Sequence, residues 1–584
     1  MQSVTKSTAE PVPASDAYYD LGAFHSPIHT QSSDAQTWFD RGLLWSYAFN
    51  HEEAIRCFQQ VIAHDPSCVM GYWGVAYAAG PNYNKRWEAF DPEDLASTFK
   101  LGHLMVQQAK RHATDVPRGE QMLLDAIACR YPTEQPPSDF KDIISSYATA
   151  MKKVYTESGQ GNLDIITLTA DALMNMNPRA LYESQTGQPR LETPVLEIRR
   201  ILEDGLKIPA ARRHVGILHL YIHLMEMSST PEAALLAADN LRSLAPDAGH
   251  AHHMPSHIDV LVGDYRRAVN TNLLSTAADD KYCEKEGPCN FYSLYRLHNY
   301  HSLIYASMLA GQRCVAVESV KRMEGTITDE LLLIRSPPMA DWLEFYSSVG
   351  VHAYIRFGMW EVLKHLPIPE NRELYSGTTA MVHYGRAIAF AATGDVESSA
   401  KERVLFLEAS KVVPESRMIF PNKVKDVLGV AAAMLDGELE YRRGNYDLAF
   451  DHLMVAIERD DALEYAEPWA WMLPTRHAYA ALLLEQGRVE DAMQAYAEDL
   501  GLDDKLVRVH QHPNNVWALH GYHECLMRLG RRAEAALVEK QLRIAKAGAD
   551  VVVDRSCFCR LEVAADMKDD AGCATECCTG SGRG

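Results

Sequence analysis

What the sequence lacks limits its class. No apolar run reaches the about 18 residues of a membrane-spanning helix, and the first twenty residues, MQSVTKSTAEPVPASDAYYD, lack the apolar core of a secretory signal. Basic side chains are the minority, with 57 Lys and Arg against 78 Asp and Glu and a net charge of −21. So acidic a surface argues against nucleic acid or an anionic membrane as the main partner. It remains compatible with metal cations.

Strand signals are also scarce, because no stretch alternates apolar and polar residues between turn clusters. The chain of 584 residues exceeds the length of about 250–300 at which a single core stops growing, so we expect several domains or a repeat array. Of its twelve cysteines, five crowd the last 28 residues. A reduced, cytoplasmic protein is the simplest interpretation.

Glycine and alanine mark a repeat. From Ala35 the residues Gly42, Ala54, Phe58 and Pro66 fall at the spacings of a helix–turn–helix unit of about 34 residues, which resembles a tetratricopeptide repeat. The turn signature G-x-x-x-x-A recurs downstream, beginning at Gly263, Gly311, Gly444, Gly487 and Gly530, with weaker copies at Gly358 and Gly394. The pattern predicts an all-α, superhelical solenoid of tetratricopeptide-like helix pairs, closed by a helix near 533–545.

This pattern divides the chain into an N-terminal arm over 1–30, a helical array with a concave, His-lined groove over 31–550, and a Cys-rich tail over 551–584. Residues 91–210 are helical in composition but lack the turn signature. Between Gly249 and Leu297 the spacing exceeds one unit by about 14 residues, including Cys283 and Cys289. We expect this insertion to form a loop, and it could act as a lid.

Histidines recur at helical spacing in three consecutive units. His219 and His223 stand four apart, as do His253 and His257, and residues four apart share one helix face. The repeat count places His298 and His301 of the next unit toward the same groove. If Pro255 occupies the first turn of a helix, the two histidine pairs point in less similar directions than the repeat count assumes. Isolated histidines, at 352, 477 and 520, are expected to be packed or solvated.

Such clusters suit a transition metal. Imidazole is a good ligand for copper, iron and zinc. Glu226 could complete a His/His/carboxylate site or act as a general base, whereas two sets of three histidines would resemble coupled dicopper sites. We favour copper, then iron with Glu226, then zinc. No Glu follows the first His of either pair, which excludes the HExxH metalloproteases. Without a metal, the imidazoles would bond to Tyr or Asp neighbours or to a bound peptide.

The tail contains a CxC at Cys557 and Cys559, a lone Cys573 and the pair Cys577 and Cys578. Thiolates select soft metals, so the tail could help to load a groove metal. Its closing Gly and Ser residues also fit a segment without an ordered role.

A closer resemblance rests on several segments. GHAHHMPSHI (249–258), LHNYHSL (297–303), GPNYN (80–84) and EYAEPWAW (464–471) resemble a family of long microbial proteins that contain tetratricopeptide repeats. The similarity spans about residues 20–560 and implies the repeat fold. Function is therefore argued from the site.

Two classes of function follow. The first is a metal-dependent enzyme, an oxidoreductase acting on a small molecule or peptide held in the groove, with metal ligands His219, His223, His253, His257, His298 and His301. The second is a non-catalytic scaffold for a protein or peptide partner, the commonest role of repeat arrays. Metal content distinguishes the two classes.

Overall fold

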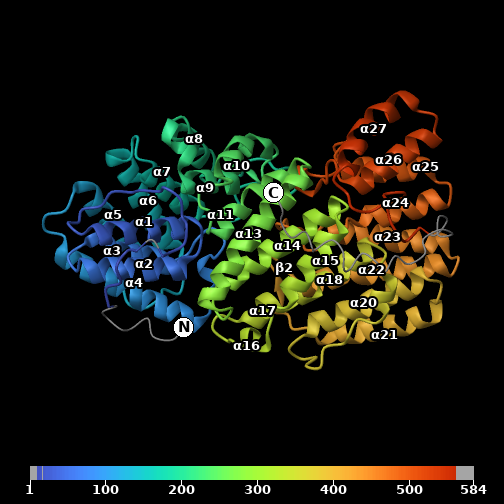
Figure 1. Ribbon diagram of the computed structural model, residues 1–584, viewed down its shortest axis with the longest axis horizontal. Coiled ribbons are helices and arrows are strands. Elements are labelled where there is room, and N and C mark those ends of the chain that lie inside the picture. Colours follow the sequence, from blue (N-terminus) through green and yellow to red (C-terminus); the bar gives the residue numbers. More distant parts are fainter. Residues whose placement is uncertain (1–9, 16, 561–584) are drawn as a thin grey trace, which may run out of the picture.

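The computed structural model describes residues 10–15 and 17–560 and is almost entirely helical (Figure 1). Within those residues the strands form one short antiparallel hairpin, in which β1 (Met418–Ile419) pairs with β2 (Asn422–Lys423). The predicted all-α solenoid is confirmed. None of the described helices is both long and apolar enough to cross a membrane.

Antiparallel helix pairs begin the array. The N-terminal helices are α1 (Ser33–Tyr47), α2 (His51–His64), α3 (Val69–Ala79), η1 (Trp87–Ala89), α4 (Pro92–His112), α5 (Arg118–Arg130), α6 (Lys141–Ser158), α7 (Leu163–Met174), α8 (Val195–Leu206), η2 (Pro209–Arg213), α9 (Val215–Met225), η3 (Pro231–Ala234) and α10 (Leu235–Leu241). The segment 91–210, which lacks the turn signature, is thus also helical.

Shorter and longer helices alternate in the middle of the chain. They are α11 (Gly249–His253), α12 (Pro255–Leu261), α13 (Tyr265–Glu286), α14 (Ser293–Leu309), α15 (Arg313–Glu324), α16 (Asp329–Leu332), α17 (Met339–Leu343), η4 (Glu344–Ser348), α18 (Val349–Arg356) and α19 (Trp360–Lys364).

The C-terminal part returns to regular pairs. Its helices are α20 (Ser376–Ala392), α21 (Val396–Val412), α22 (Val424–Arg442), α23 (Tyr446–Asp461), α24 (Thr475–Glu485), α25 (Val489–Leu500), η5 (Arg508–His510), α26 (Val516–Arg528) and α27 (Arg532–Lys546). The last of these is the closing helix that the sequence predicts.

The glycines of the turn signature explain the pairing. All seven predicted turn glycines have a positive φ, between 62° for Gly358 and 87° for Gly394, a conformation that costs other residues energy. In the first unit a side chain at Gly42 would lie 2.7 Å from the Phe58 ring, so glycine permits the close approach of α1 and α2. The repeat spacing is therefore a packing requirement.

Two expectations about the middle region need correction. The extra residues before His298, about 283–296, form only a short connection over 287–292, because the others extend α13 or begin α14. Just before them, Tyr282 is buried at 2% exposure against Tyr19 and Tyr292, which holds this end of α13 in the core. The second expectation is that His253 and His257 lie on one helix. Met254 instead separates α11, which contains His253, from α12, which contains His257 and has Pro255 in its first turn. A proline in mid-helix lacks a hydrogen-bond donor, which accounts for the break.

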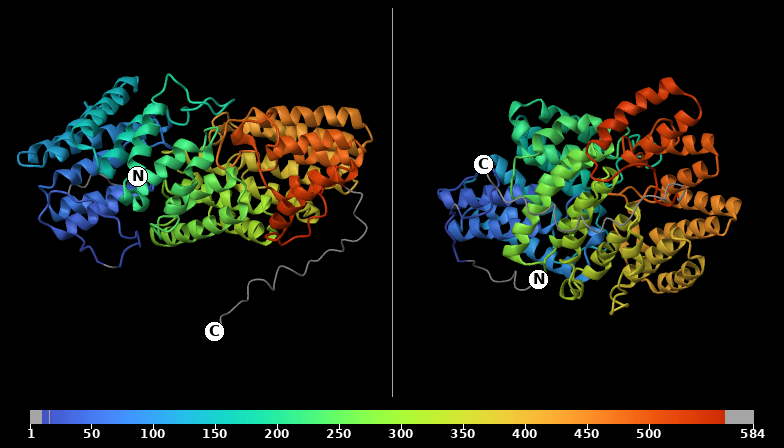
Figure 2. Two further views of the ribbon diagram at one scale, coloured as in Figure 1. Left: turned by 90° about the horizontal axis from the view of Figure 1, so that it is seen from above. Right: turned by 45° about the vertical axis from the view of Figure 1, so that its right-hand side comes forward.

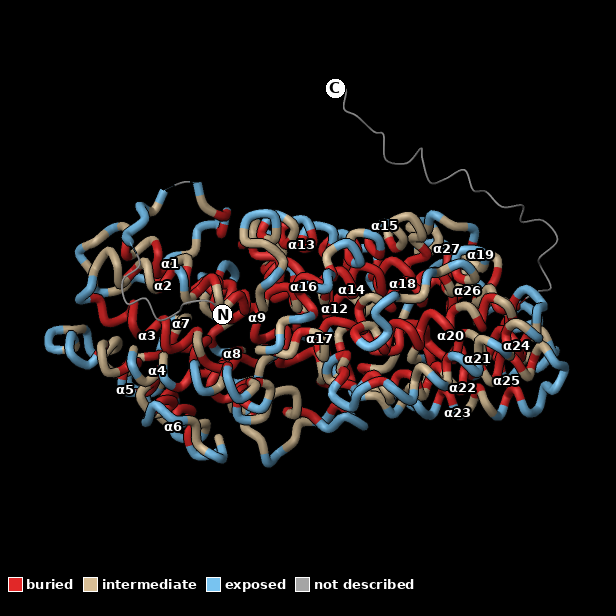
Figure 3. The backbone as a smooth tube through the Cα atoms, turned by 90° about the horizontal axis from the view of Figure 1, so that it is seen from below, coloured by how far each residue is buried: buried red, intermediate tan, exposed pale blue. Residues whose placement is uncertain are grey.

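Two hydrophobic cores follow one another along the molecule. One runs from Tyr19 to Tyr295 and the other from Leu261 to Cys559, so they meet around α12 to α14. Figure 2 shows the N-terminal and C-terminal helices gathered at opposite ends, and Figure 3 shows buried backbone continuing between them. The predicted histidines lie close to this junction.

The described part of the tail, residues 551–560, packs onto the C-terminal helices. The carbonyl of Ser556 accepts from Arg356, the Arg560 guanidinium lies 2.9 Å from a Glu524 carboxylate oxygen, and Phe558 covers Gly358. Cys557 and Cys559 form a disulfide, so this pair does not offer the free thiolates that the sequence suggested. Cys573, Cys577 and Cys578 lie outside the described residues.

Candidate metal centre

Six histidines converge from four helices at the junction of the two cores. α9 supplies His219 and His223, α11 supplies His250 and His253, α12 supplies His257, and α14 supplies His298. They form two compact triads: the first contains His219, His223 and His250, and the second contains His253, His257 and His298. Within each triad, one ligand-capable nitrogen from every ring lies within 4.8 Å of the others.

The second triad points its Nε2 atoms at one centre. His253 Nε2 lies 2.7 Å from His257 Nε2 and 2.8 Å from His298 Nε2. His253 Nδ1 lies 2.7 Å from Asn272 Oδ1, and the Asn272 amide nitrogen donates to the Ala268 carbonyl, which fixes the oxygen toward the ring. His253 therefore carries its proton on Nδ1 and turns an Nε2 lone pair inward.

His257 is oriented in the same way. Its Nδ1 lies 2.5 Å from Glu226 Oε2, which holds the proton on Nδ1. The Nε2 atoms of His253 and His257 then face each other as two lone pairs at 2.7 Å. Two acceptors at this separation repel unless a cation lies between them. A metal ion bound by both would remove the conflict.

The first triad leaves its inward nitrogens without partners. His219 Nδ1 lies 2.5 Å from the Tyr47 carbonyl oxygen and His223 Nδ1 lies 2.9 Å from Glu226 Oε1. Their Nε2 atoms, and both ring nitrogens of His250, are buried and have no hydrogen-bond partner among the described residues. Buried polar atoms are almost always bonded, so unpartnered ones point to an absent water or ion.

Glu226 joins the two triads. It is fully buried, and its two carboxylate oxygens contact Nδ1 of His223 in the first triad and Nδ1 of His257 in the second. Outer hydrogen-bond partners of this kind fix the tautomer and the direction of metal-ligating imidazoles. Glu226, with His223 and His257, is also a compact ligand set. Since both oxygens already contact imidazoles, the geometry favours orientation of the ligands over a free general base.

The environment keeps five of the rings neutral. Burial, followed by the neighbouring imidazole of His223, lowers the pKa of His219 well below its usual value, and burial followed by His257 does the same for His223 and His253. The pKa values of His250 and His298 are lowered for the same reasons. Neutral imidazole is the form that binds metal.

The structure places one of the six predicted ligands outside both triads. The ring of His301 is 5.4 Å from that of Tyr346, and burial followed by the neighbouring imidazole of His352 lowers its pKa to about 3. His250, in contrast, lies in the first triad. On a helix, residues 250, 253 and 257 share a face, so spacing could have identified His250. The sequence prediction did not include it among the ligands.

The histidines are also more enclosed than a His-lined groove implies. His219, His223, His253 and His257 are between 0% and 4% exposed, and His298 is half-buried. The walls are aromatic, because the Phe49 ring lies 4.5 Å from His219, Tyr83 lies 5.1 Å from His223, and Tyr295 lies 4.7 Å from His250. Sequence spacing gives no signal for Phe49, which follows α1 and has a positive φ of 58°.

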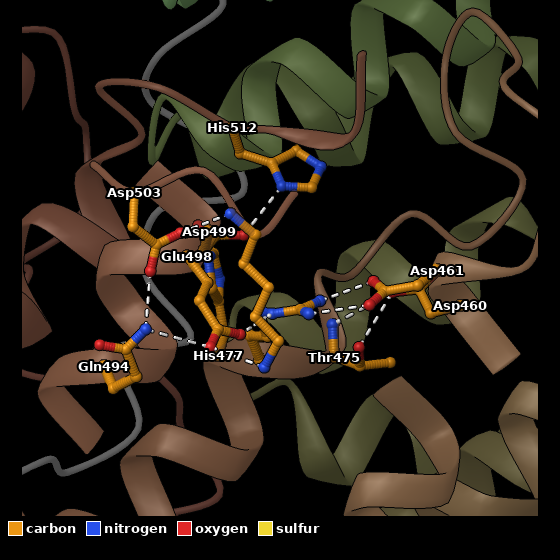
Figure 4. Close-up of polar contacts among 11 residues, drawn as sticks. Asp460, Asp461, Thr475, His477, Gln494, Glu498, Asp499, Asp503 and His512 are labelled. Carbon is orange, nitrogen blue, oxygen red and sulfur yellow. Dashed lines mark hydrogen bonds and ion pairs between the residues drawn. The ribbon is translucent and has the colours of Figure 1, made fainter. Parts of the chain in front are cut away.

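The C-terminal half contains buried histidines of another kind (Figure 4). His477 Nε2 and His512 Nδ1 each lie 2.8 Å from an oxygen of the buried Asp499 carboxylate, and Asn515 donates to the same group. Arg356 donates to the other nitrogen of His477. Burial alone would raise the pKa of Asp499, but His477 and His512 lower it. His477 is thus packed and partnered, in agreement with the prediction for isolated histidines.

Comparisons with known proteins do not assign this site. No family model matches the chain, and no curated protein matches it. Among solved structures, yeast Tom70 has 10% identity and a TM-score of 0.23 over 87% of this chain and 92% of that chain. The complex of Naa15 and Naa10 bound to HypK has 12% identity and a TM-score of 0.21, with 87% of this chain and 70% of that chain covered. Likenesses this weak bear on neither activity nor partners.

Proposed function

We propose that the two triads bind two transition-metal ions and that the protein is a dinuclear metal-dependent oxidoreductase. The observation that carries the proposal is the orientation of the imidazoles: four of them are bonded at Nδ1, whereas among the described residues their Nε2 atoms lack partners or oppose one another at 2.7 Å, and neither nitrogen of His250 has a partner. A packed core has no use for that arrangement, because each unpartnered buried group costs about 1–3 kcal/mol.

Copper is the first choice of metal. The proposed ligands are six imidazole nitrogens with no carboxylate among them, a set that suits copper well and leaves positions free for dioxygen or substrate. Iron, with Glu226 turned inward as a ligand, comes second and zinc third. The triads are adjacent, since the rings of His250 and His253 are 5.8 Å apart and those of His223 and His257 are 5.7 Å apart. A neighbouring pair of redox metals can exchange two electrons with one substrate.

The test is the metal content of protein purified without a histidine tag after growth with copper, iron and zinc supplied. We expect about two metal ions per chain in the wild type, about one in His223→Ala and in His257→Ala, and no loss in His383→Ala, which removes a buried histidine outside the triads that is bonded to Glu402. Less than about 0.2 metal per chain in the wild type would refute the metal centre and leave the scaffold hypothesis.

A further inference from the structure

A cavity of about 930 Å³ lies between α2, α3 and α4, beside the first histidine triad. Its volume is within the range of about 300–1,000 Å³ that is typical of small-molecule sites. Phe49 lines the cavity and also contacts the imidazoles, with its ring 4.5 Å from His219 and 5.4 Å from His250. One aromatic ring therefore separates the cavity from the triad.

The cavity is long and mainly apolar. Along α2 it is lined by one helix face, at positions 52, 55, 59, 62 and 63, and along α4 by positions 94, 98, 101 and 105. Positions 52 to 63 span about 16 Å at 1.5 Å per residue. An extended apolar molecule would match this shape, because it would bury its length against Ile55, Ile62, Leu101 and Met105.

One group of polar side chains lies around Lys85. The Lys85 ammonium lies 2.6 Å from Asp94 Oδ2 and over the rings of Phe90 and Phe291 at 3.8 and 4.6 Å, so its charge is already matched. Lys85 also contributes, after burial, to lowering the pKa of His51 to about 4, and the His51 ring lies 6.3 Å from that of Phe49. These polar groups therefore lie at the end of the cavity that adjoins the triad.

Asp94 has an unused acceptor there. Its side chain is 2% exposed, and its Oδ1 atom has no hydrogen-bond partner among the described residues. A buried carboxylate oxygen without a partner accepts a hydrogen bond from a ligand hydroxyl or amine, and it repels a ligand carboxylate. This end of the cavity therefore favours a ligand group that donates a hydrogen bond.

We propose that the cavity is the substrate site of the histidine-ligated centre, and that the substrate is an elongated apolar molecule whose hydroxyl or amino group donates to Asp94 Oδ1 beside Phe49. This inference rests on the proposed function for the chemistry and names its substrate class. Oxidation of an alcohol to an aldehyde, or of an amine to an imine, removes two electrons and two protons, and dioxygen would accept them.

The binding step can be tested on metal-free protein by calorimetric titration with dodecan-1-ol, dodecylamine and dodecanoate at pH 8. We expect the alcohol and the amine to bind at least about tenfold more tightly than the carboxylate, since charge repulsion at Asp94 costs about 1.4 kcal/mol or more. Leu101→Trp should abolish binding by filling the cavity. Leu95→Trp is the matched control, because Leu95 is half-buried on the same helix but does not line the cavity.

The link to the centre is tested with copper-loaded protein. Dodecan-1-ol should shift the visible absorption of bound copper(II) in the wild type and Leu95→Trp, and should cause no shift in Leu101→Trp, whose copper content should equal that of the wild type. Probe binding without a spectral shift, or tighter binding of dodecanoate, would overturn the inference. A protein that holds copper but binds no probe would refute the substrate site alone, whereas one that binds probes but no metal would refute the proposed centre as well.

Discussion

The histidines of the first triad and His477 of the C-terminal half have opposite hydrogen-bond patterns. In the C-terminal half, both ring nitrogens of His477 are bonded, one to Asp499 and one to Arg356. In the N-terminal half, His219 and His223 are bonded only at Nδ1, while their Nε2 atoms lack partners among the described residues. Histidine thus completes a hydrogen-bond network in one region, whereas in the other it leaves ring nitrogens without partners among the described residues.

The difference shows what distinguishes a ligand from a structural histidine. Burial alone does not, because His477 is 1% exposed and His223 is also 1% exposed. What differs is the number of bonded ring nitrogens, which is two in His477 and one in His223, whose Nε2 has no partner among the described residues. Separate substitutions in each region should therefore change different quantities.

The largest effect is expected for His477→Leu. This change leaves the buried Asp499 carboxylate without one of its donors and Arg356 without one of its acceptors. Leaving a buried charged group without a hydrogen-bond partner costs more than the about 1–3 kcal/mol of a neutral group. Urea denaturation of metal-free protein measures that loss, and elemental analysis should show unchanged metal content. A fall in metal content while the N-terminal half stays folded would contradict the distinction between structural and metal-binding histidines.

His250→Leu should have the opposite sign. Neither ring nitrogen of His250 has a hydrogen-bond partner among the described residues, so leucine removes two unpartnered buried atoms and breaks no bond. We expect metal-free protein to gain about 1–3 kcal/mol of unfolding free energy and to lose the metal of the first triad. Destabilisation together with full metal content would show that His250 is a packed residue.

Glu226→Gln sharpens the contrast within the site. Glutamine keeps the volume, but its amide can accept from only one imidazole, whereas Glu226 contacts both His223 and His257. We expect metal affinity to fall by about 10- to 100-fold at both triads. Competition with a chelator of known affinity measures the change. Glu402→Gln, which affects the isolated His383, is the matched control and should leave the affinities unchanged.

Sequence spacing predicted the helices better than it predicted the contacts between them. The turn glycines predicted where each helix pair turns, because a backbone position with a positive φ favours glycine and can therefore be recognised in the sequence. The positions of His219, His223, His253, His257 and His298 were also predictable, since helical spacing determines which residues share a face. His301 was expected beside His298, but its ring lies next to Tyr346, outside both triads.

Contacts between distant segments were not predictable. Asn272 Oδ1 faces His253 across the packing of α13 against α11, and spacing within either helix does not indicate that contact. Phe49 reaches the triad through a turn conformation with φ of 58° that no spacing rule anticipates. Both depend on packing between helices, which a count along the sequence does not contain.

The smallest effect concerns pH and belongs to the C-terminal network. Burial, followed by the neighbouring charge of Asp461, raises the pKa of Asp460 to about 7, above the 3.8 expected for the unfolded chain. Between these two values the folded protein binds more protons than the unfolded one, so this group's contribution to stability falls as pH rises from about 4 to about 7.

Asp460→Asn should remove that dependence, since the amide does not titrate and its oxygen can still accept from the Thr475 hydroxyl, which lies 3.0 Å from Asp460 Oδ2. We expect the wild type to lose at most about 1.4 kcal/mol per pH unit between pH 5 and 7 from this group, and the variant to show a flatter profile. Calorimetric melting of metal-free protein at half-unit intervals measures both slopes. Parallel profiles would show that Asp460 ionises in the same way in the folded and unfolded chain. Asp460 would then not distinguish the C-terminal half from the N-terminal half.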